Sequence, residues 1–214
     1  MPEFTPSSVG VALITSSSIL GFIAILTTWL RVTVRISRRA FGADDVLMVA
    51  ATFMTVIRYS INIHAVRAGY GRHQNDLNED EYTYTKFLSW LGQIFLFIAL
   101  CLMKISIGLL IMRIKESKKS NIFQWTLIAG LVLTNLEVLI VLFAECRPMS
   151  AYWDTDAGTC WPNKYRIYSI YIQVGFSIIT DVIYSLMPAA LVWRLTMKLK
   201  KKLGICALMS MGLW

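Results

Sequence analysis

The chain has 214 residues, of which 56% are hydrophobic and only 16% are charged. Soluble domains carry roughly 25% charged residues and cannot bury this much apolar surface, so a soluble globular fold is excluded. The net charge of +8 would suit a nucleic-acid-binding protein. Its lysines and arginines, however, form short clusters between apolar stretches, which is typical of topology signals in membrane proteins. We therefore expect the lipid bilayer as a partner, and no nucleic acid.

Five apolar stretches are long enough to cross the hydrocarbon core of a bilayer, which takes about 20 helical residues. In chain order they cover residues 10–32, 45–66, 87–112, 122–144 and 167–193. A sixth begins at Leu203 and would reach only about 18 Å before the sequence stops. The chain is then a fragment, or its gene model ends early, or the last stretch is re-entrant. The sequence predicts an all-α, multi-pass transmembrane helical bundle, a single domain over residues 1–214 that is truncated in its sixth span.

The loops predict the orientation, because lysine and arginine are enriched in short cytoplasmic loops. The loops after the first, third and fifth spans hold thirteen of these residues, and the loops on the other side hold six. We expect the first side to be cytoplasmic and the N-terminus to lie outside, at the plasma membrane in preference to an endomembrane. Cys146 and Cys160 would share an outer loop, where disulfides persist. Their bridge would stabilise the fold by about 3 kcal/mol.

Four ionisable side chains fall inside the predicted spans, where such groups are costly and often functional. Measured from the predicted cytoplasmic ends, Arg58 would lie about 20 Å deep, Glu137 about 24 Å, Asp181 about 19 Å and Lys104 about 13 Å. Arg58 is thus within reach of Glu137 or Asp181, and Lys104 within reach of Asp181. These pairs either bind a ligand or proton or fix helix register, and the two interpretations carry similar weight. Lys104 has a further option, which is to extend to the cytoplasmic headgroups.

Other motifs indicate turns and anchors rather than chemistry. Pro188, seven residues after Asp181, predicts either an ordinary bend or a hinge, and we favour the bend. The glycines at 69 and 71 are expected to end the second helix, since no strand precedes them as in a phosphate-binding loop. His64 and His73 lack the tight helical spacing of a metal site. We expect no metal, no cofactor and no catalytic residues, and we lean against an enzyme.

Several of these features occur together in a characteristic order. Arg31-x-x-x-Arg35 is followed by Gly42-Ala43-Asp44-Asp45, Gly69-x-Gly71-x-His73, Lys104-x-Ser106-Ile107, Arg113-Ile114, Cys146-x-Pro148, Trp153-Asp154, Gly158-x-Cys160, Asp181 and Pro188. In this order the chain resembles the fungal integral-membrane rhodopsin-domain family, which includes the Pth-eleven-like candidate G-protein-coupled receptors and the membrane proteins of satratoxin-type clusters. The resemblance covers nearly the whole chain and implies seven helices with an outer N-terminus. It does not imply retinal.

Two functions follow as expectations. The first is a receptor-like protein that senses a small or surface-derived cue, with Asp44, Asp45 and Arg113 facing a G protein or another cytoplasmic effector. The second is an accessory or tailoring protein of fungal secondary metabolism, in which Arg58, Glu137 and Asp181 would line a pocket for a hydrophobic metabolite. A transporter ranks lowest, because no internal helical repeat is evident.

Overall fold

The computed structural model describes residues 8–71, 78–114, 117–154 and 158–194. In these residues the chain forms α1 (Ser8–Ser37), α2 (Ala43–Arg67), α3 (Glu79–Ile114) and α4 (Lys118–Ala144). A short segment follows, with β1 (Cys146–Arg147), the 3₁₀ helix η2 (Met149–Tyr152) and β2 (Thr159–Cys160). The chain then enters α5 (Lys164–Arg194). The fold is all-α apart from the two-residue antiparallel pair that β1 and β2 form.

All five predicted spans are confirmed. Each of the five α-helices contains a stretch long and apolar enough to cross a membrane, within Gly10–Ser37, Ala43–Arg67, Glu79–Arg113, Lys118–Ala144 and Lys164–Met187. Most of these helices extend beyond the predicted apolar stretches, because backbone hydrogen bonding continues into the polar flanks where side chains meet water and headgroups. The expected sixth span, from Leu203, lies outside the described residues.

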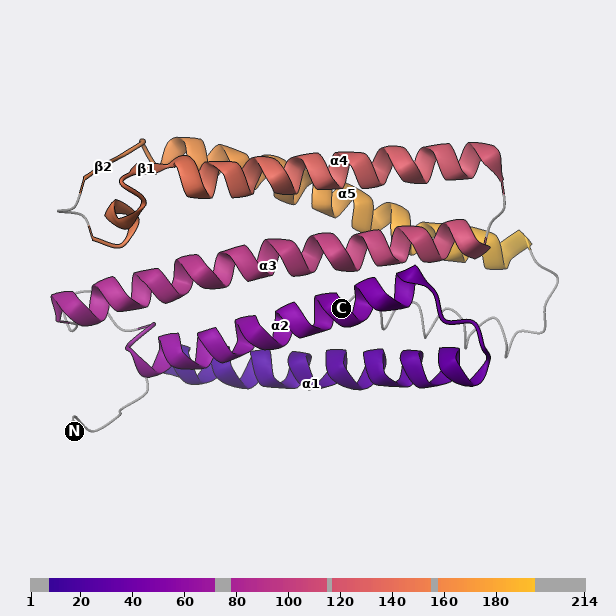
Figure 1. The fold of residues 1–214 in the computed structure, drawn as a ribbon, viewed down its shortest axis with the longest axis horizontal. Coiled ribbons are helices and arrows are strands. Elements are labelled where there is room, and N and C mark those ends of the chain that lie inside the picture. Colours follow the sequence, from indigo (N-terminus) through magenta and orange to yellow (C-terminus); the bar gives the residue numbers. More distant parts are fainter. Residues whose placement is uncertain (1–7, 72–77, 115–116, 155–157, 195–214) are drawn as a thin grey trace.

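Consecutive helices run up and down and pack against their neighbours (Figure 1). The most extensive packing joins α2 to α3, and α5 packs along α4 and touches α3. This arrangement gives the bundle two ends. We call one the disulfide end, where α2 stops, α3 starts and β1 and β2 lie, and the other the basic end, where α1 and α3 stop and α2 and α4 start.

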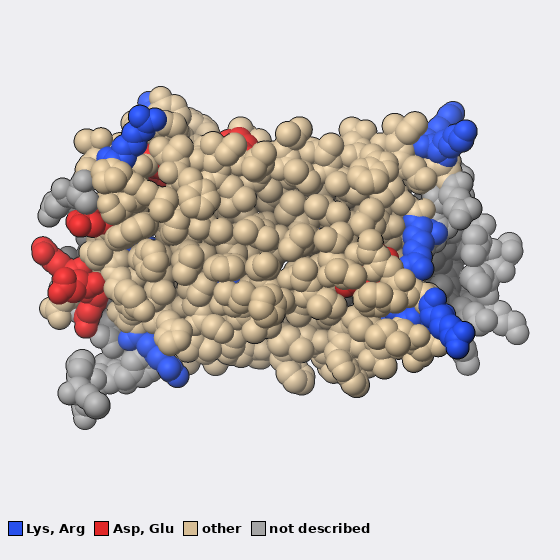
Figure 2. All heavy atoms as spheres, viewed as in Figure 1, with Lys and Arg blue, Asp and Glu red and all other residues tan. Residues whose placement is uncertain are grey.

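The outer surface of the bundle is apolar. Large hydrophobic side chains are exposed along α1, α4 and α5, among them Phe22, Ile122 and Tyr171, each 68% exposed. On the face shown in Figure 2, charged side chains gather at the two ends and leave a nearly uncharged band between them. This is the surface that a bilayer solvates, because hydrocarbon favours apolar side chains and charged groups belong at the interfaces.

Small residues bring α3, α4 and α5 close together. A Cβ atom on Gly130 of α4 would lie 2.5 Å from the Phe176 ring of α5. One on Gly108 of α3 would lie 3.0 Å from Ile128 and 3.1 Å from the Tyr184 hydroxyl. Since lipid tails are as apolar as leucine, helices in membranes gain stability from such close packing. These contacts position the polar side chains of α3 and α5 described below.

The glycines after the second span act as predicted. The Tyr70 N–H donates to the Ala65 carbonyl, and Gly69 and Gly71 adopt φ values of 108° and 93°. These are left-handed conformations that residues with a side chain rarely adopt, and they end α2 as a C-terminal cap does. The motif therefore turns the chain at the disulfide end. His73 lies outside the described residues.

Candidate functional site: a cavity lined by Arg58

An arginine–aspartate network ties α1, α2 and α3 together at the basic end. Asp44 and Asp45 occupy the first turn of α2 and are 4% and 0% exposed. The Arg31 guanidinium binds both, with Nη2 3.0 Å from Asp44 Oδ2 and Nε 3.0 Å from Asp45 Oδ1. Arg35 reaches the same carboxylates from the next turn of α1, and Arg113 of α3 lies 3.3 Å from Asp44 Oδ1. Two buried anions are thus compensated by three cations.

The network also anchors the backbone. Asp45 Oδ2 accepts the Gly42 N–H at 3.2 Å, which satisfies a donor at the start of α2. The Ser106 hydroxyl of α3 donates to the Asp44 carbonyl at 2.6 Å. A Cβ at position 42 would lie 2.7 Å from Arg113 Nη1, so glycine there lets Arg113 approach. Arg31, Arg35, Gly42, Asp44 and Asp45 of the order quoted above thus act together at this end of the bundle.

The network corrects where the sequence analysis placed the two aspartates. Asp44 and Asp45 were expected to face a cytoplasmic effector, but both carboxylates are buried beneath arginine side chains and cannot themselves touch a partner. Arg113 is the exception among the three residues named for this role, since its side chain is 43% exposed. The aspartates were misplaced because a charged pair at a helix start usually indicates exposure, and only the converging arginines make burial favourable.

Lys104 and Asp181 meet, as their depths predicted. Lys104 Nζ lies 2.9 Å from Asp181 Oδ1 and donates to the Ser177 carbonyl, the Ser177 hydroxyl and the Thr180 hydroxyl. The Lys104 side chain is 4% exposed, so it points into the bundle and not toward the headgroups. Asp181 is 49% exposed, on the flank of α5. Lys104 thus links α3 to α5 with its hydrogen-bonding capacity filled.

Glu137 makes a separate contact. The Ser169 hydroxyl of α5 donates to Glu137 Oε1 of α4, while Glu137 Oε2 is buried without a hydrogen-bond partner among the described residues. Arg58 reaches neither Glu137 nor Asp181, and no ion pair of Arg58 occurs within the described residues. The four intramembrane charges are therefore distributed over three sites and do not form one cluster. Depth along the membrane suggested a meeting, but Arg58 faces α1 and α3 on the other side of the bundle.

A cavity of about 180 Å³ opens between α1, α2 and α3, and Arg58 is its charged residue. It lies in the half of the bundle nearer the disulfide end, since it reaches Leu13 near the start of α1 and Val66 near the end of α2. Its polar lining also includes Asn62 of α2 and Gln93 of α3. The full lining is Leu13, Ile14, Ser17, Arg58, Tyr59, Asn62, Ile63, Ala65, Val66, Tyr70, Ser89, Gly92, Gln93 and Leu96.

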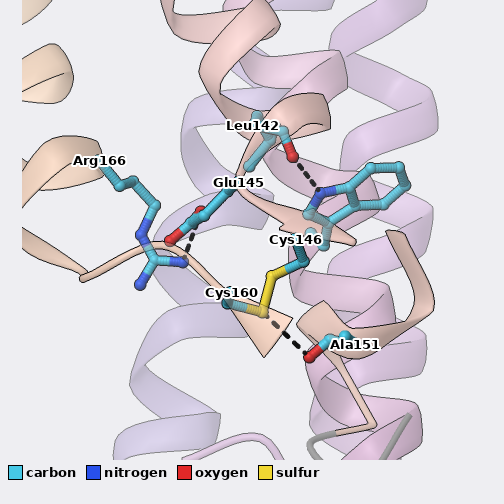
Figure 3. Close-up of a disulfide and its surroundings, with 7 residues drawn as sticks. Leu142, Glu145, Cys146, Ala151, Cys160 and Arg166 are labelled. Atoms are coloured by element: carbon cyan, nitrogen blue, oxygen red, sulfur yellow. Dashed lines mark hydrogen bonds and ion pairs between the residues drawn. A yellow bond between two sulfur atoms is a disulfide. The ribbon is translucent and has the colours of Figure 1, made fainter. Parts of the chain in front are cut away.

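The disulfide end is braced by the predicted Cys146–Cys160 bridge, which is present (Figure 3). The two cysteines are partners in the β1–β2 pair, and Trp90 of α3 donates its indole N–H to the Leu142 carbonyl of α4 at 3.3 Å. The rings of Phe87, Phe143, Tyr152 and Trp153 surround that indole or pack beside it. The segment from β1 to β2 therefore packs against α3 through the rings of Tyr152 and Trp153.

Glu145 and Arg166 form an ion pair next to this bridge. Arg166 Nη1 lies 3.3 Å from Glu145 Oε2, and the Glu145 side chain is 3% exposed (Figure 3). Burial raises the pKa of Glu145, while the charge and hydrogen bond of Arg166 lower it. Burial likewise raises the pKa of Tyr152, whose ring lies 5.3 Å from the Arg166 guanidinium. The pair joins the end of α4 to the start of α5.

Sequence reasoning missed the neutral polar side chains of the cavity. Asn62 and Gln93 lie within predicted spans, and a buried amide in a membrane is itself a signal, weaker than a charge but readable. The Glu145–Arg166 pair was not predicted, because nothing in the spacing of two loop residues reveals a contact. Pro188 lies within α5, which continues helical to Arg194. Whether Pro188 makes an ordinary bend, as we favour, or a hinge stays a prediction.

Comparison with known proteins gives a matching family model and curated relatives. The sequence model of the fungal rhodopsin domain matches residues 30–214. A protein of Emericella nidulans named SAT4 family membrane protein is 26% identical over 159 residues, which are 72% of this chain and 41% of that protein. Fugralins biosynthesis cluster protein 2 of Gibberella zeae is 28% identical over 105 residues, 46% of this chain and 25% of that protein.

The chain therefore spans less than half the length of these curated relatives. No solved structure is significantly similar to it. The domain match covers most of the chain and begins at the end of α1, so it includes the arginine–aspartate network, the Lys104–Asp181 pair and the disulfide. This multi-pass membrane protein belongs to the fungal rhodopsin domain family.

Proposed function

We propose that this protein is receptor-like and senses a small molecule, which binds in the cavity between α1, α2 and α3. The observation that carries the proposal is the cavity itself, a space between α1, α2 and α3 in which Arg58, Asn62 and Gln93 lie beside apolar side chains. Concave sites with a few convergent polar groups are the usual form of small-molecule sites. Ionisable residues inside a membrane are costly, which favours a functional role for the one that faces this space.

The proposed orientation places the cavity toward the outside. The basic end collects the loops with most lysines and arginines, which favours a cytoplasmic location, and the disulfide end would then meet an oxidising space. In this orientation the N-terminus is outside and the protein resides in the plasma membrane. A ligand arriving from outside would enter the half of the bundle that holds the cavity.

Helix α2 provides a physical link from the cavity to the cytoplasmic side. Arg58 and Asn62 line the cavity, and Asp44 and Asp45 begin the same helix in the arginine network. A ligand that shifts α2 along or about its axis would change the contacts of these carboxylates. The half-exposed Arg113 would present that change to a G protein or another effector. Such a signal requires that the ligand bind one arrangement of α2 better than the other.

The experiment is a ligand screen that uses a variant with a filled cavity as its control. The full-length protein in lipid nanodiscs is screened against small-molecule fractions of the growth medium, and a rise in its unfolding midpoint reports binding. Gly92 lines the cavity, and a Cβ there would meet Asn62 and Ile61 only at ordinary 3.8 Å contacts. Gly92→Ala should therefore bind ligands normally, and the bulkier Gly92→Leu should abolish binding. Equal responses from both variants would contradict a ligand site in this cavity.

A second function has its own support. One relative is named a protein of the fugralins biosynthesis cluster, which favours an accessory or tailoring role in secondary metabolism. The matched test is metabolite profiling of a deletion strain against its parent. A lost product with an accumulated precursor would favour the metabolic function. An unchanged profile, with altered responses to external cues, would favour the receptor.

A further inference from the structure

The chemistry of the cavity indicates which class of ligand it would bind. Arg58 projects from the middle of α2 into this space, and within the described residues no carboxylate pairs with it. All other intramembrane charges described above have a polar partner. Arginine stays protonated in proteins, so the cavity holds a permanent positive charge. A cation buried at this depth without an anionic partner favours the binding of an anionic ligand.

A second observation comes from the facing helix. The amide oxygen of Gln93 on α3 is buried and has no hydrogen-bond partner among the described residues. Gln93 and Arg58 line the same cavity from opposite helices. Tyr59, by contrast, is already engaged, because its hydroxyl lies 2.6 Å from that of Ser18. Arg58 and Gln93 thus present a fork of N–H donors on one side of the cavity and an acceptor on the other. Buried polar groups usually find a partner, and here a ligand can supply both.

Size and charge limit the ligand further. The cavity measures about 180 Å³, and an engineered protein cavity of about 150 Å³ holds one benzene ring. A single arginine matches one negative charge, and its planar fork matches a carboxylate through two parallel hydrogen bonds. A phosphate dianion would remain undercompensated, since Arg58 is the charged residue among the described lining. Leucine and isoleucine side chains supply apolar contacts around the rest of the space.

We propose that the cavity binds a small monocarboxylate of about one aromatic ring, with the carboxylate on Arg58 and a ligand hydroxyl donating to Gln93. This inference rests on the proposed function, in which the same cavity is the ligand site. It adds a chemical class: small hydroxylated aromatic or aliphatic acids bind, and their uncharged analogues of equal shape bind poorly. The carboxylate would complete the missing ion pair, and the hydroxyl would satisfy the buried amide.

The test uses benzoate, 4-hydroxybenzoate and the neutral isostere benzamide as probes. The full-length protein is placed in nanodiscs, and binding is measured by saturation-transfer NMR and by the unfolding midpoint. Benzoate should bind at least about tenfold more tightly than benzamide, because charge-assisted hydrogen bonds are worth at least that factor. Arg58→Gln should remove this preference. Arg67→Gln, an exposed arginine on the same helix, should retain it. Gln93→Leu should erase the advantage of 4-hydroxybenzoate over benzoate.

A stability measurement separates a ligand-binding role from a structural one. If Arg58 is kept for a ligand, then Arg58→Gln should raise the unfolding midpoint of the ligand-free protein, because it removes an uncompensated charge. A lowered midpoint with unchanged benzoate binding would overturn the inference. If benzamide binds as well as benzoate, and Gly92→Leu blocks both, the ligand class is wrong while the cavity remains a binding site. If screened ligands bind but Gly92→Leu does not affect them, the proposed function fails as well.

Discussion

Replacing Asp45 with alanine should destabilise this protein strongly, although the residue lies near the membrane surface where charges are usually tolerated. Asp45 is fully buried and receives Arg31 at 3.0 Å, Arg35 at 3.8 Å and the Gly42 N–H at 3.2 Å. Alanine would leave three arginines sharing the single carboxylate of Asp44 and would leave a helix-start donor unpaired. It would also loosen the contact of α1 with α2.

The magnitude follows from these contacts. Removing one partner of a buried ion pair costs about 3–5 kcal/mol. Arg31 is 20% exposed and keeps Asp44 as a partner, so the lower end, about 3 kcal/mol, is expected. For a chain of this length that corresponds to a drop of roughly 6–12 °C in the unfolding midpoint. Asp45→Asn retains an oxygen for the cap and should lose about half as much.

The assay is thermal unfolding in nanodiscs with a thiol-reactive fluorophore, because unfolding exposes the half-buried, unpaired Cys101 of α3. Asp80→Ala is the matched control, since Asp80 also occupies the first turn of a helix but is exposed. The control midpoint should stay at the wild-type value. If Asp45→Ala also stays within about 2 °C of wild type, the network does not stabilise the bundle and this reasoning is wrong.

Three further outcomes are expected. Lys104→Met and Asp181→Asn should each lower the activity of the protein. Their effects on stability should be less than additive, because the two side chains share one ion pair. A double-mutant cycle measures this coupling. Cys160→Ser, or reduction of the wild-type protein, should cost about 3 kcal/mol of stability, and a reducing agent should then have no further effect on the variant. Burial raises the pKa of Glu145 above its unfolded value, so stability falls as the pH rises through the folded-state pKa. Arg166→Ala removes the charge that opposes this shift. Its stability deficit should therefore be largest at neutral pH and shrink as the pH falls toward 4.5, and a deficit independent of pH would refute the assignment.

One contact of the polar network was predictable from residue types and depth. The Lys104–Asp181 contact was anticipated, because an intramembrane lysine and aspartate at overlapping depths both gain by pairing. The pairing of Arg58 with Glu137 or Asp181 did not form, although the depths were equally compatible. Depth gives only the position of a side chain along the helix axis. Which neighbour the side chain faces depends on the rotation of the helix about that axis, which apolar sequences specify weakly.

The sequence by itself determined that this chain crosses a membrane five times over the described residues, how the helices alternate in direction, and which cysteines pair. Those properties follow from local hydropathy and chain length, since hydrocarbon allows few structures for a polar backbone. Only the tertiary structure decided that Asp44 and Asp45 are buried, and that Arg58 and Gln93 face one cavity. These depend on how α1, α2 and α3 rotate and pack. Van der Waals contacts among many similar apolar side chains set that packing, and no short stretch of sequence encodes it.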